Sequence, residues 1–523
     1  MDAPKFPTRP PAARFFSFPA KNPSSAHKPH SRSLWLSIAS SVVFVVLVYL
    51  AAASRSPPPP LRFGIIIDAG SSGTRIHVFG SKGESGAIPS LVPGSTAVMR
   101  VTPGLSAFSG DPERAGASLE ELLEFAKGKV AKDRWRDTEV RLMATAGLRM
   151  VDMGPRERIL ESCRRVLRLS GFRFKNEWAT VIPGSDEGTY AWVAANYALG
   201  SLGGDPEKTT GIMELGGASA QVTFVSSETL PSEFSRMLTF GKTTYNLYSN
   251  SFLHFGQNAA HESLRKLLNS RDIKTSDVSR QEGTLVDPCS PKGYSHGECS
   301  LAFFPDVINT YLDHKLVLHA GGNFSECRST ALSLLQKEKD NCLYQLCHLG
   351  STFIPKMQGN FIATENFFYT SKFFGLSPTS SLSEMMHAGE EYCEQDWSKT
   401  KKKYHSADEE DLSRYCFSAA YIVALLHDSF GIPLDDKRIE YSNQVGDMEI
   451  DWALGAYIVQ SMTKSSESVG WVTAMIHGDL VLLLLVASAL LVLTAWLVSK
   501  WRRPRMKTIY DLEKGHYIIT RAS

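Results

Sequence analysis

One stretch of the sequence decides the fold: Ile65-Ile66-Ile67-Asp68-Ala69-Gly70-Ser71-Ser72-Gly73-Thr74-Arg75-Ile76-His77-Val78-Phe79. An apolar run, a tight Gly/Ser turn and a second run with apolar positions predict two strands joined by a loop. Such a turn directs backbone N–H groups and hydroxyls toward an anion, since glycine adopts the dihedral angles that this needs. Asp68 at the rim would repel a bare phosphate. The pattern therefore predicts a cation, held directly or through water, between this carboxylate and a phosphate.

The same arrangement recurs later in the chain as Gly211-Ile212-Met213-Glu214-Leu215-Gly216-Gly217-Ala218-Ser219-Ala220-Gln221-Val222-Thr223-Phe224. A single Gly-rich hairpin usually does no more than connect two strands. Two hairpins with the acid in the same place indicate a duplicated fold that holds phosphates from both sides.

Two uncharged segments predict membrane anchors. Residues 34–53 would form a helix about 30 Å long, which matches a bilayer core, and residues 480–498 are also free of charge. Basic residues flank both segments on their outer sides, which places both chain ends in the cytosol and the central region in a lumen or outside the cell. A cleaved signal peptide is the alternative for the first segment. Its apolar run exceeds the usual length and follows a long basic arm, so an uncleaved anchor is favoured.

Composition and cysteine usage agree with this topology. The chain has 523 residues, 43% of them hydrophobic, so it can bury a core of more than one lobe. Its net charge of +2 gives no electrostatic reason to expect a nucleic-acid partner. All eight cysteines lie between the two apolar segments, which indicates disulfides in an oxidising compartment. A zinc site is the alternative, but no CxxC pair supports it. Cys163 is expected to be a buried free thiol, and Asn323 begins a glycosylation sequon.

Helical spacing of apolar residues predicts helices over 113–130, 156–169 and 189–199. Before the last of these, a strand is expected to end at a Pro-Gly turn, with Ser185 or Asp186 as the helix cap. Glu187 in this turn has two interpretations. It either favours the helix dipole, or it is a general base at the carboxyl edge of a strand, where open α/β folds place their sites.

Five segments together resemble the nucleoside triphosphate diphosphohydrolases, the apyrase family, which has cell-surface and Golgi members. They are residues 68–75, 144–149, 182–192 with Asn196, 212–224 and 451–457, in the family's order. The resemblance covers almost all of the region between the two predicted membrane helices. Those two terminal anchors also match the family's common topology.

The resemblance implies an α/β fold of the actin-like and sugar-kinase ATPase superfamily, with two duplicated RNase H-like lobes and nucleotide in the cleft between them. Lobe I is expected to span residues 62–183 and 444–470, and lobe II residues 184–443. Outside the lobes, residues 1–33 are expected to be a disordered cytosolic arm, 54–61 a Pro-rich spacer and 499–523 a cytosolic tail.

The resemblance also implies roles for individual residues. Asp68 and Glu214 would orient waters on a Ca²⁺ or Mg²⁺ ion, with Trp452 near this shell, and Glu187 would be the catalytic base. Thr145, Ser219 and Gln221 would hold the attacking water or the metal shell. The phosphate chain would be held by Ser71, Ser72, Gly73, Gly216, Gly217, Ala218 and Ser219, and the base would be held between Tyr369 and Tyr415.

Two positions depart from the family pattern. Glu214 stands where an aspartate is usual, and Lys292 stands where some members have arginine. The disulfides Cys342–Cys347 and Cys393–Cys416 are implied by the resemblance. Cys327 is left with either Cys289 or Cys299 as its partner.

These features favour a membrane-integrated hydrolase that removes the terminal phosphate of nucleoside tri- and/or diphosphates in the Golgi lumen or outside the cell. An exopolyphosphatase-like phosphohydrolase, which shares a similar first hairpin, and a nucleotide-binding pseudoenzyme are the alternatives. No nucleic-acid partner is expected, and a homo-oligomer formed through the two membrane helices is left open.

Overall fold

The computed structural model describes residues 61–83, 87–274, 284–295, 317–336, 347–462, 487–489, 491–497, 506–511 and 515–521. The chain divides into two compact units, one formed by residues 59–472 and the other by 1–58 with 473–523. In the second of these, the described residues form short helical segments at 487–489 and 491–497 and a hairpin of β19 (Met506–Asp511) and β20 (His516–Arg521).

The predicted membrane segment at 34–53 lies outside the described residues, and of the one at 480–498 only 487–489 and 491–497 are described. In the described ranges, every helix is too short or too polar to span a lipid bilayer.

The first sheet of the 59–472 unit is built on the hairpin that the sequence predicts. Strand β1 (Arg62–Ala69) pairs antiparallel with β2 (Thr74–Lys82), and Ile65, Ile66 and Ile67 are buried. The strand order is β3-β2-β1-β5-β6, and β4 pairs with β2. The other strands are β3 (Ser90–Leu91), β4 (Ala97–Val101), β5 (Glu139–Ala144) and β6 (Ala179–Val181).

A second sheet repeats this plan with the order β16-β15-β7-β8-β10-β9. Strands β7 (Gly211–Leu215) and β8 (Ser219–Val225) form the second predicted hairpin, and β15 (Phe361–Glu365) runs parallel to β7. The remaining strands are β9 (Ser235–Phe240), β10 (Thr243–Leu253) and β16 (Ile439–Tyr441). Glu214 faces Gln221 across the second hairpin just as Asp68 faces Arg75 across the first.

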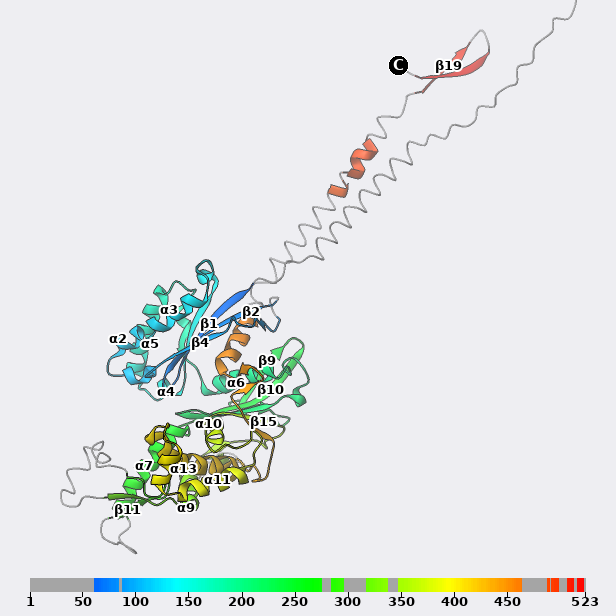
Figure 1. Ribbon diagram of the computed structural model, residues 1–523. Coiled ribbons are helices and arrows are strands. Elements are labelled where there is room, and N and C mark those ends of the chain that lie inside the picture. The colour runs from blue at the N-terminus through cyan, green and yellow to red at the C-terminus, as the bar shows by residue number, and fades with distance from the viewer. Residues whose placement is uncertain are drawn as a thin grey trace, which may run out of the picture. The chain divides into compact units, whose positions relative to one another are not determined.

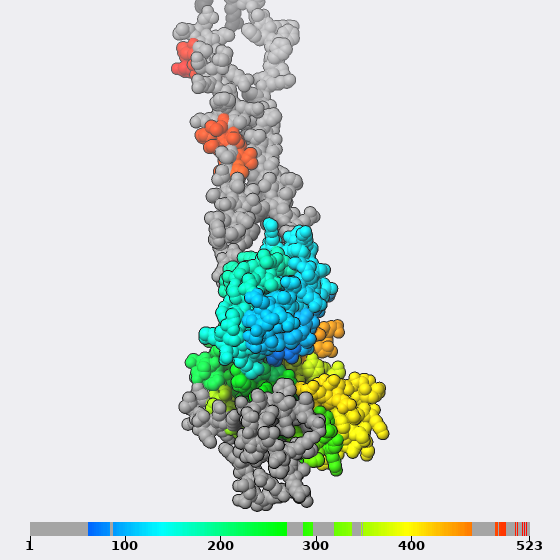
Figure 2. Space-filling view, turned by 90° about the vertical axis from the view of Figure 1, so that its left-hand side faces the viewer, coloured from blue at the N-terminus to red at the C-terminus, as the bar shows by residue number. Residues whose placement is uncertain are grey.

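Each sheet has its own helices, which Figure 1 shows at opposite ends of the unit. The first sheet packs with α2 (Pro112–Ala117), α3 (Glu120–Lys129), α4 (Ala146–Arg149) and α5 (Met153–Leu169). The second packs with α7 (Gln257–Lys274), α9 (Phe324–Leu335), α10 (Asn366–Phe373), α11 (Leu382–Glu394), α12 (Trp397–Lys403), α13 (Glu409–Val423) and the π-helix η7 (Ala424–Ser429). In the space-filling view, the part of the chain that holds the first sheet and its helices (blue and cyan) lies above the yellow surface of the later helices (Figure 2).

A third apolar cluster joins the two sheets. It combines Ile66 and Met143 of the first sheet with Ile212 of the second, through α6 (Gly184–Ala198) and the helix at 452–462. Residues from the beginning and the end of this unit therefore share one core. Because both helices pack between the sheets, they set the relative position of the two hairpins.

All three predicted helices have different bounds in the structure. The segment 113–130 forms two helices, α2 and α3, α5 begins at Met153 rather than at 156, and α6 begins at Gly184 rather than at 189. The predicted cap by Ser185 or Asp186 is wrong, because Pro183 occupies the N-cap position without a side-chain hydrogen bond. Glu187 consequently lies in the first turn of the helix.

Further short elements complete the described residues. They are β11 (Thr284–Asp287), β12 (Val317–Ala320), β13 (Cys347–Leu349), β14 (Thr352–Phe353), β17 (Gln444–Val445), β18 (Met448–Glu449) and the 3-10 turns η1 (Leu105–Phe108), η2 (Lys132–Asp137), η3 (Asn176–Trp178) and η4 (Pro206–Lys208).

Candidate active site

The two Gly-rich loops approach each other directly. A Cβ atom added to Gly217 would lie 2.9 Å from Ser71 Oγ, and one added to Gly147 would lie 2.7 Å from Ser71 Cα. Glycine is therefore required on both sides of the first loop, since a larger residue would move it. The arrangement brings the N–H groups and hydroxyls of both loops to one place, as a phosphate chain held from two sides requires.

Strand and helix ends hold these loops firmly. In the second loop, the Gly216 and Gly217 carbonyl oxygens accept hydrogen bonds from the N–H groups of Gln257 and Asn258, at 2.8 and 2.9 Å. In the first, the Arg100 guanidinium donates a hydrogen bond of 3.1 Å to Ser72 Oγ. These bonds restrain the conformation of both loops.

Two carboxylates lie beneath the loops, one from each hairpin. Asp68 is 2% exposed and Glu214 is 8% exposed. Asp68 Oδ1 and Glu214 Oε2 have no hydrogen-bond partner among the described residues, and Arg75 lies 3.4 Å from the other Asp68 oxygen. Burial, followed by repulsion from neighbouring carboxylates, raises the pKa of both groups well above their ordinary values. Buried acceptors without donors fit a cation or its water shell.

Glu187 forms an ion pair with Arg149, which reaches it from α4. The same guanidinium donates a hydrogen bond of 3.2 Å to Ser251 Oγ on β10. Burial raises the pKa of the Glu187 carboxyl to about 7, while Arg149 acts to lower it. A Cβ at Gly184 would collide with the Arg149 guanidinium, so the start of α6 is shaped for this pair. A carboxyl with this pKa is suited to accepting a proton near neutral pH.

Small polar residues named from the sequence are linked to the Arg149–Glu187 pair, because Arg149 and Gln221 both donate to Ser251 Oγ. Gln221 Nε2 donates hydrogen bonds to Ser219 Oγ at 2.7 Å and to Ser251 Oγ at 3.2 Å, so one amide orients two hydroxyls. Thr145 is 4% exposed and follows β5 at the edge where β1 ends at Ala69, one residue after Asp68. Its backbone N–H donates to the Ala69 carbonyl at 3.2 Å.

Trp452 is 7% exposed and begins the helix at 452–462. Its ring stacks near that of Tyr190 on α6, with 6.5 Å between the ring centroids. Before it, Asp451 Oδ1 accepts a hydrogen bond of 2.7 Å from the Ala453 N–H, and Asp451 Oδ2 lies 3.7 Å from His77 Nε2. The last segment therefore brings another carboxylate to the site.

The aromatic residues assigned to the base lie on α10 and α13. Tyr369 is 48% exposed, whereas Tyr415 is half-buried and stacks on Phe373 with 3.5 Å between the ring centroids. Between Tyr369 and Tyr415 themselves, no ring contact is found in the described part of the chain. One face of Tyr415 is covered by protein.

Two residues of the site carry no distinctive sequence pattern. Arg149 ends the segment 144–149 that resembles the apyrase family, but no neighbouring residue in the sequence indicates that it pairs with Glu187. Glu365, at the end of β15, has φ 57° and ψ −122°, and it is one of two non-glycine residues with positive φ among those described. Its charge raises the pKa of Asp68, Glu187 and Glu214, so its carboxylate belongs to the same group.

The carboxylates of this acidic group are too far apart to ligate one metal ion directly. Among the described residues, no three His, Cys, Asp or Glu side chains are placed to hold a metal ion by direct ligation. The orphaned oxygens of Asp68 and Glu214 fit a divalent cation held through water, with Ca²⁺ and Mg²⁺ both suited to oxygen donors.

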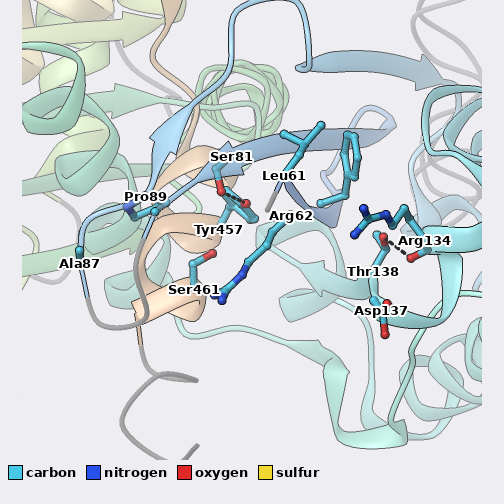
Figure 3. A pocket seen from close by; sticks show the side chains of 12 residues that line it. Leu61, Arg62, Ser81, Ala87, Pro89, Arg134, Asp137, Thr138, Tyr457 and Ser461 are labelled. Atoms are coloured by element: carbon cyan, nitrogen blue, oxygen red, sulfur yellow. Dashed lines mark hydrogen bonds between the residues drawn. The ribbon is translucent and has the colours of Figure 1, made fainter. Parts of the chain in front are cut away.

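A cavity of about 300 Å³ lies at the opposite end of β1, at Arg62 and Phe63 (Figure 3). Tyr457 and Ser81 line it and share a hydrogen bond of 2.6 Å. Since the carboxylates lie at the other end of the strand, this cavity is separate from the site.

The disulfides cross-link helices that pack on the second sheet. Cys393 of α11 bonds to Cys416 of α13, the pairing that the resemblance implied, and Cys327 bonds to Cys289. Cys347 is disulfide-bonded, while Cys342 and Cys299 lie outside the described residues. Cys163 is buried and free, which confirms the prediction. Asn323 of the sequon is exposed at the start of α9, where its side chain accepts a hydrogen bond from the Glu326 N–H.

Comparison with known proteins agrees with this geometry. Residues 58–470 match the GDA1/CD39 (nucleoside phosphatase) family. The chain is 55% identical over 469 residues to "Probable apyrase 6" of Arabidopsis thaliana, covering 88% of this chain and 84% of that relative. It is 28% identical over 441 residues to "Ectonucleoside triphosphate diphosphohydrolase 1" of Mus musculus, covering 80% and 84%.

Among solved structures, the nucleoside triphosphate hydrolases of Neospora caninum share the fold with a TM-score of 0.59 at 18% identity, covering 82% of this chain and 96% of that one. The match over residues 58–470 includes both hairpins, Glu187 and Trp452. With this site and these relatives, the chain belongs to the GDA1/CD39 family and is an apyrase-type nucleoside phosphatase that hydrolyses nucleoside tri- and/or diphosphates.

Proposed function

We propose that Glu187 is the general base of this hydrolysis and that the two Gly-rich loops hold the phosphate chain. Glu187 accepts a proton from a water molecule, whose oxygen attacks the terminal phosphorus. The bond from this phosphorus to the bridging oxygen breaks, and orthophosphate and the shortened nucleotide leave. The observation that carries the proposal is the buried Glu187, with a pKa of about 7, beside the meeting point of the two loops.

The neighbouring groups have distinct tasks in this scheme. Ser71, Ser72 and Gly73 donate to one part of the phosphate chain, and Gly216, Gly217, Ala218 and Ser219 donate to the other. Gln221 and Thr145 position the attacking water, and Arg149 holds Glu187 in place. Loss of one such donor would be expected to cost about 10²–10³ in rate, as it does for oxyanion-stabilising groups elsewhere.

Asp68 and Glu214 are proposed to hold a Ca²⁺ or Mg²⁺ ion through water, with Trp452 beside it. When bound, the ion supplies positive charge to the phosphate oxygens. Glu214 is one methylene longer than the aspartate that is usual in the family, so we propose that it affects the choice between the two cations. Tyr369 and Tyr415 are proposed to hold the nucleobase between them.

We further propose that residues 34–53 and 480–498 anchor the protein in a Golgi or plasma membrane, with the catalytic unit lumenal or extracellular. Lobe I would comprise residues 62–183 and 444–470, and lobe II residues 184–443. Supporting this arrangement are the uncharged segments with basic flanks and the disulfides Cys289–Cys327 and Cys393–Cys416. Protease protection in sealed microsomes would test it: cleavage of the catalytic unit from the cytosolic side would contradict the topology.

The activity itself is tested by phosphate release from ATP, ADP, GDP and UDP with Ca²⁺, with Mg²⁺ and with EDTA, using the full-length protein. We expect release with a divalent cation and none with EDTA. Preference for GDP and UDP would support a Golgi role, and preference for ATP and ADP a role at the cell surface. Full activity in EDTA would contradict the proposed cation.

A further inference from the structure

Glu365 is held in a backbone conformation that side chains rarely adopt. It ends β15 with φ 57° and ψ −122°, and non-glycine residues keep such angles only where the surrounding structure enforces them. The register of β15 on β7 places Glu365 beside Leu215, directly before the second Gly-rich loop. The strand therefore delivers a carboxylate to the edge of the sheet where Glu214 lies.

Hydrogen bonds on both sides of Glu365 enforce this conformation. Its backbone N–H donates to Asn443 Oδ1 at 2.7 Å, and the next residue, Asn366, donates to the Leu215 carbonyl at 2.6 Å. The Asn443 carbonyl in turn accepts a bond of 2.8 Å from Ile450, the residue before Asp451. One asparagine thus ties the end of β15 to the segment that carries Asp451.

The carboxylate of Glu365 is coupled electrostatically to Asp451 and to the guanidinium groups of Arg75 and Arg100, and it in turn acts on Asp68 and Glu214. Counted together, the coupled side chains are the four carboxylates of Glu365, Asp451, Asp68 and Glu214 against the two guanidinium groups of Arg75 and Arg100. Arg75 already pairs with Asp68. His77, the remaining base at Asp451, has its pKa lowered by burial and is therefore a poor source of positive charge. The local excess of negative charge calls for a further cation.

An independent observation points to the same ligand. Asp68 Oδ1 and Glu214 Oε2 are buried without a hydrogen-bond partner in the described residues, although both side chains are more than nine-tenths buried. Unpaired carboxylate oxygens at such depth are costly unless a cation or its water shell faces them. Both carboxylates interact with Glu365.

We propose that Glu365 is a third acidic residue of the divalent-cation site, where it would help Asp68 and Glu214 to hold the water shell of the ion. The three carboxylates come from β1, β7 and β15, so an ion held there would draw on residues of both sheets. This inference rests on the proposed cation dependence of the enzyme and assigns to the site a residue that neither Gly-rich hairpin contains.

The test is direct cation binding by the EDTA-stripped full-length protein, measured by calorimetric titration with Ca²⁺ and with Mg²⁺ in the absence of nucleotide. Glu365→Gln should raise the Kd by about 10–100-fold, the usual effect of losing a group that supports a bound metal. Glu365→Asp keeps the charge and should recover most of the affinity. The matched control is Glu440→Gln, since Glu440 is exposed on the neighbouring strand β16.

A second variant separates cation binding from folding. Glu365→Gly removes the carboxylate but suits the positive φ, so its unfolding midpoint in EDTA should equal or exceed that of the wild type while its cation affinity falls. A Kd within about threefold of the wild type for both cations in Glu365→Gln and Glu365→Gly, or an equal loss in Glu440→Gln, would overturn the inference. Absence of cation binding in the wild type would overturn the proposed cation dependence as well.

Discussion

Glu187 illustrates how one residue sets the pH range of the enzyme. Burial raises the pKa of its carboxyl to about 7, and below that pH the group is protonated and cannot accept a proton from water. We expect kcat/KM to fall as the pH drops below about 7. Glu187→Gln should lower kcat by about 10²–10⁴ and remove this limb of the pH profile. Glu207→Gln, which changes an exposed carboxylate, is the control. An unchanged profile in Glu187→Gln would contradict the assignment.

Asp68 is a second single residue whose role in the site lowers the stability of the cation-free folded protein, because its carboxylate is buried. Its pKa is raised in the folded protein, so its contribution to stability is present below its ordinary pKa and is lost as the pH rises through the folded value. Asp68→Asn should therefore stabilise the cation-free protein at neutral pH by about 1–3 kcal/mol while abolishing activity. Thermal unfolding in EDTA, with exposed Asp447→Asn as control, measures this. A lower midpoint for Asp68→Asn than for wild type would refute it.

At the scale of the element, the contact between the two loops matters more than either loop alone. A Cβ at position 217 would lie 2.9 Å from Ser71 Oγ and 3.1 Å from Asn258 Nδ2. Gly217→Ala should therefore displace the first loop and lower kcat by about 10–10², since small errors in position are costly in catalysis. The unfolding midpoint should change little. Gly128→Ala is the matched control, because nothing lies within 4 Å of a Cβ there. Equal activities of the two variants would show that the loop contact is unimportant.

In the molecule as a whole, the helix at 452–462 packs the last residues of the catalytic unit against its first sheet and α6. A Cβ at Gly455 would lie 1.8 Å from the Tyr190 carbonyl oxygen, so this helix and α6 pack backbone to backbone. Tyr457 also shares a hydrogen bond with Ser81 of β2. Gly455→Ala should separate these elements, destabilise the protein by about 1–3 kcal/mol and lower activity through Trp452. Chemical unfolding and phosphate release measure both effects. Wild-type stability in this variant would mean that the packing relaxes freely.

Local patterns account for the parts of the fold that the sequence predicts correctly. The two hairpins follow from an apolar run and a Gly-rich turn, and the helix α5 and buried Cys163 follow from helical periodicity. These features depend on neighbours in the chain. Their residues consequently carry the information themselves, which is why Asp68 and Glu214 are recognisable as equivalent acids from the order of residues alone.

Local sequence patterns do not predict the contacts between segments that are far apart in the chain. The need for glycine at position 184 comes from Arg149, the partner of Cys327 depends on how α9 meets the chain at Cys289, and Glu365 reaches the site only because β15 pairs with β7. A glutamate at a strand end looks ordinary in sequence. Composition and spacing therefore determine the hairpins and the chemistry of their acids, while packing between the sheets alone assembles Arg149, Glu187 and Glu365 into one site, because those contacts join residues that are far apart in the chain.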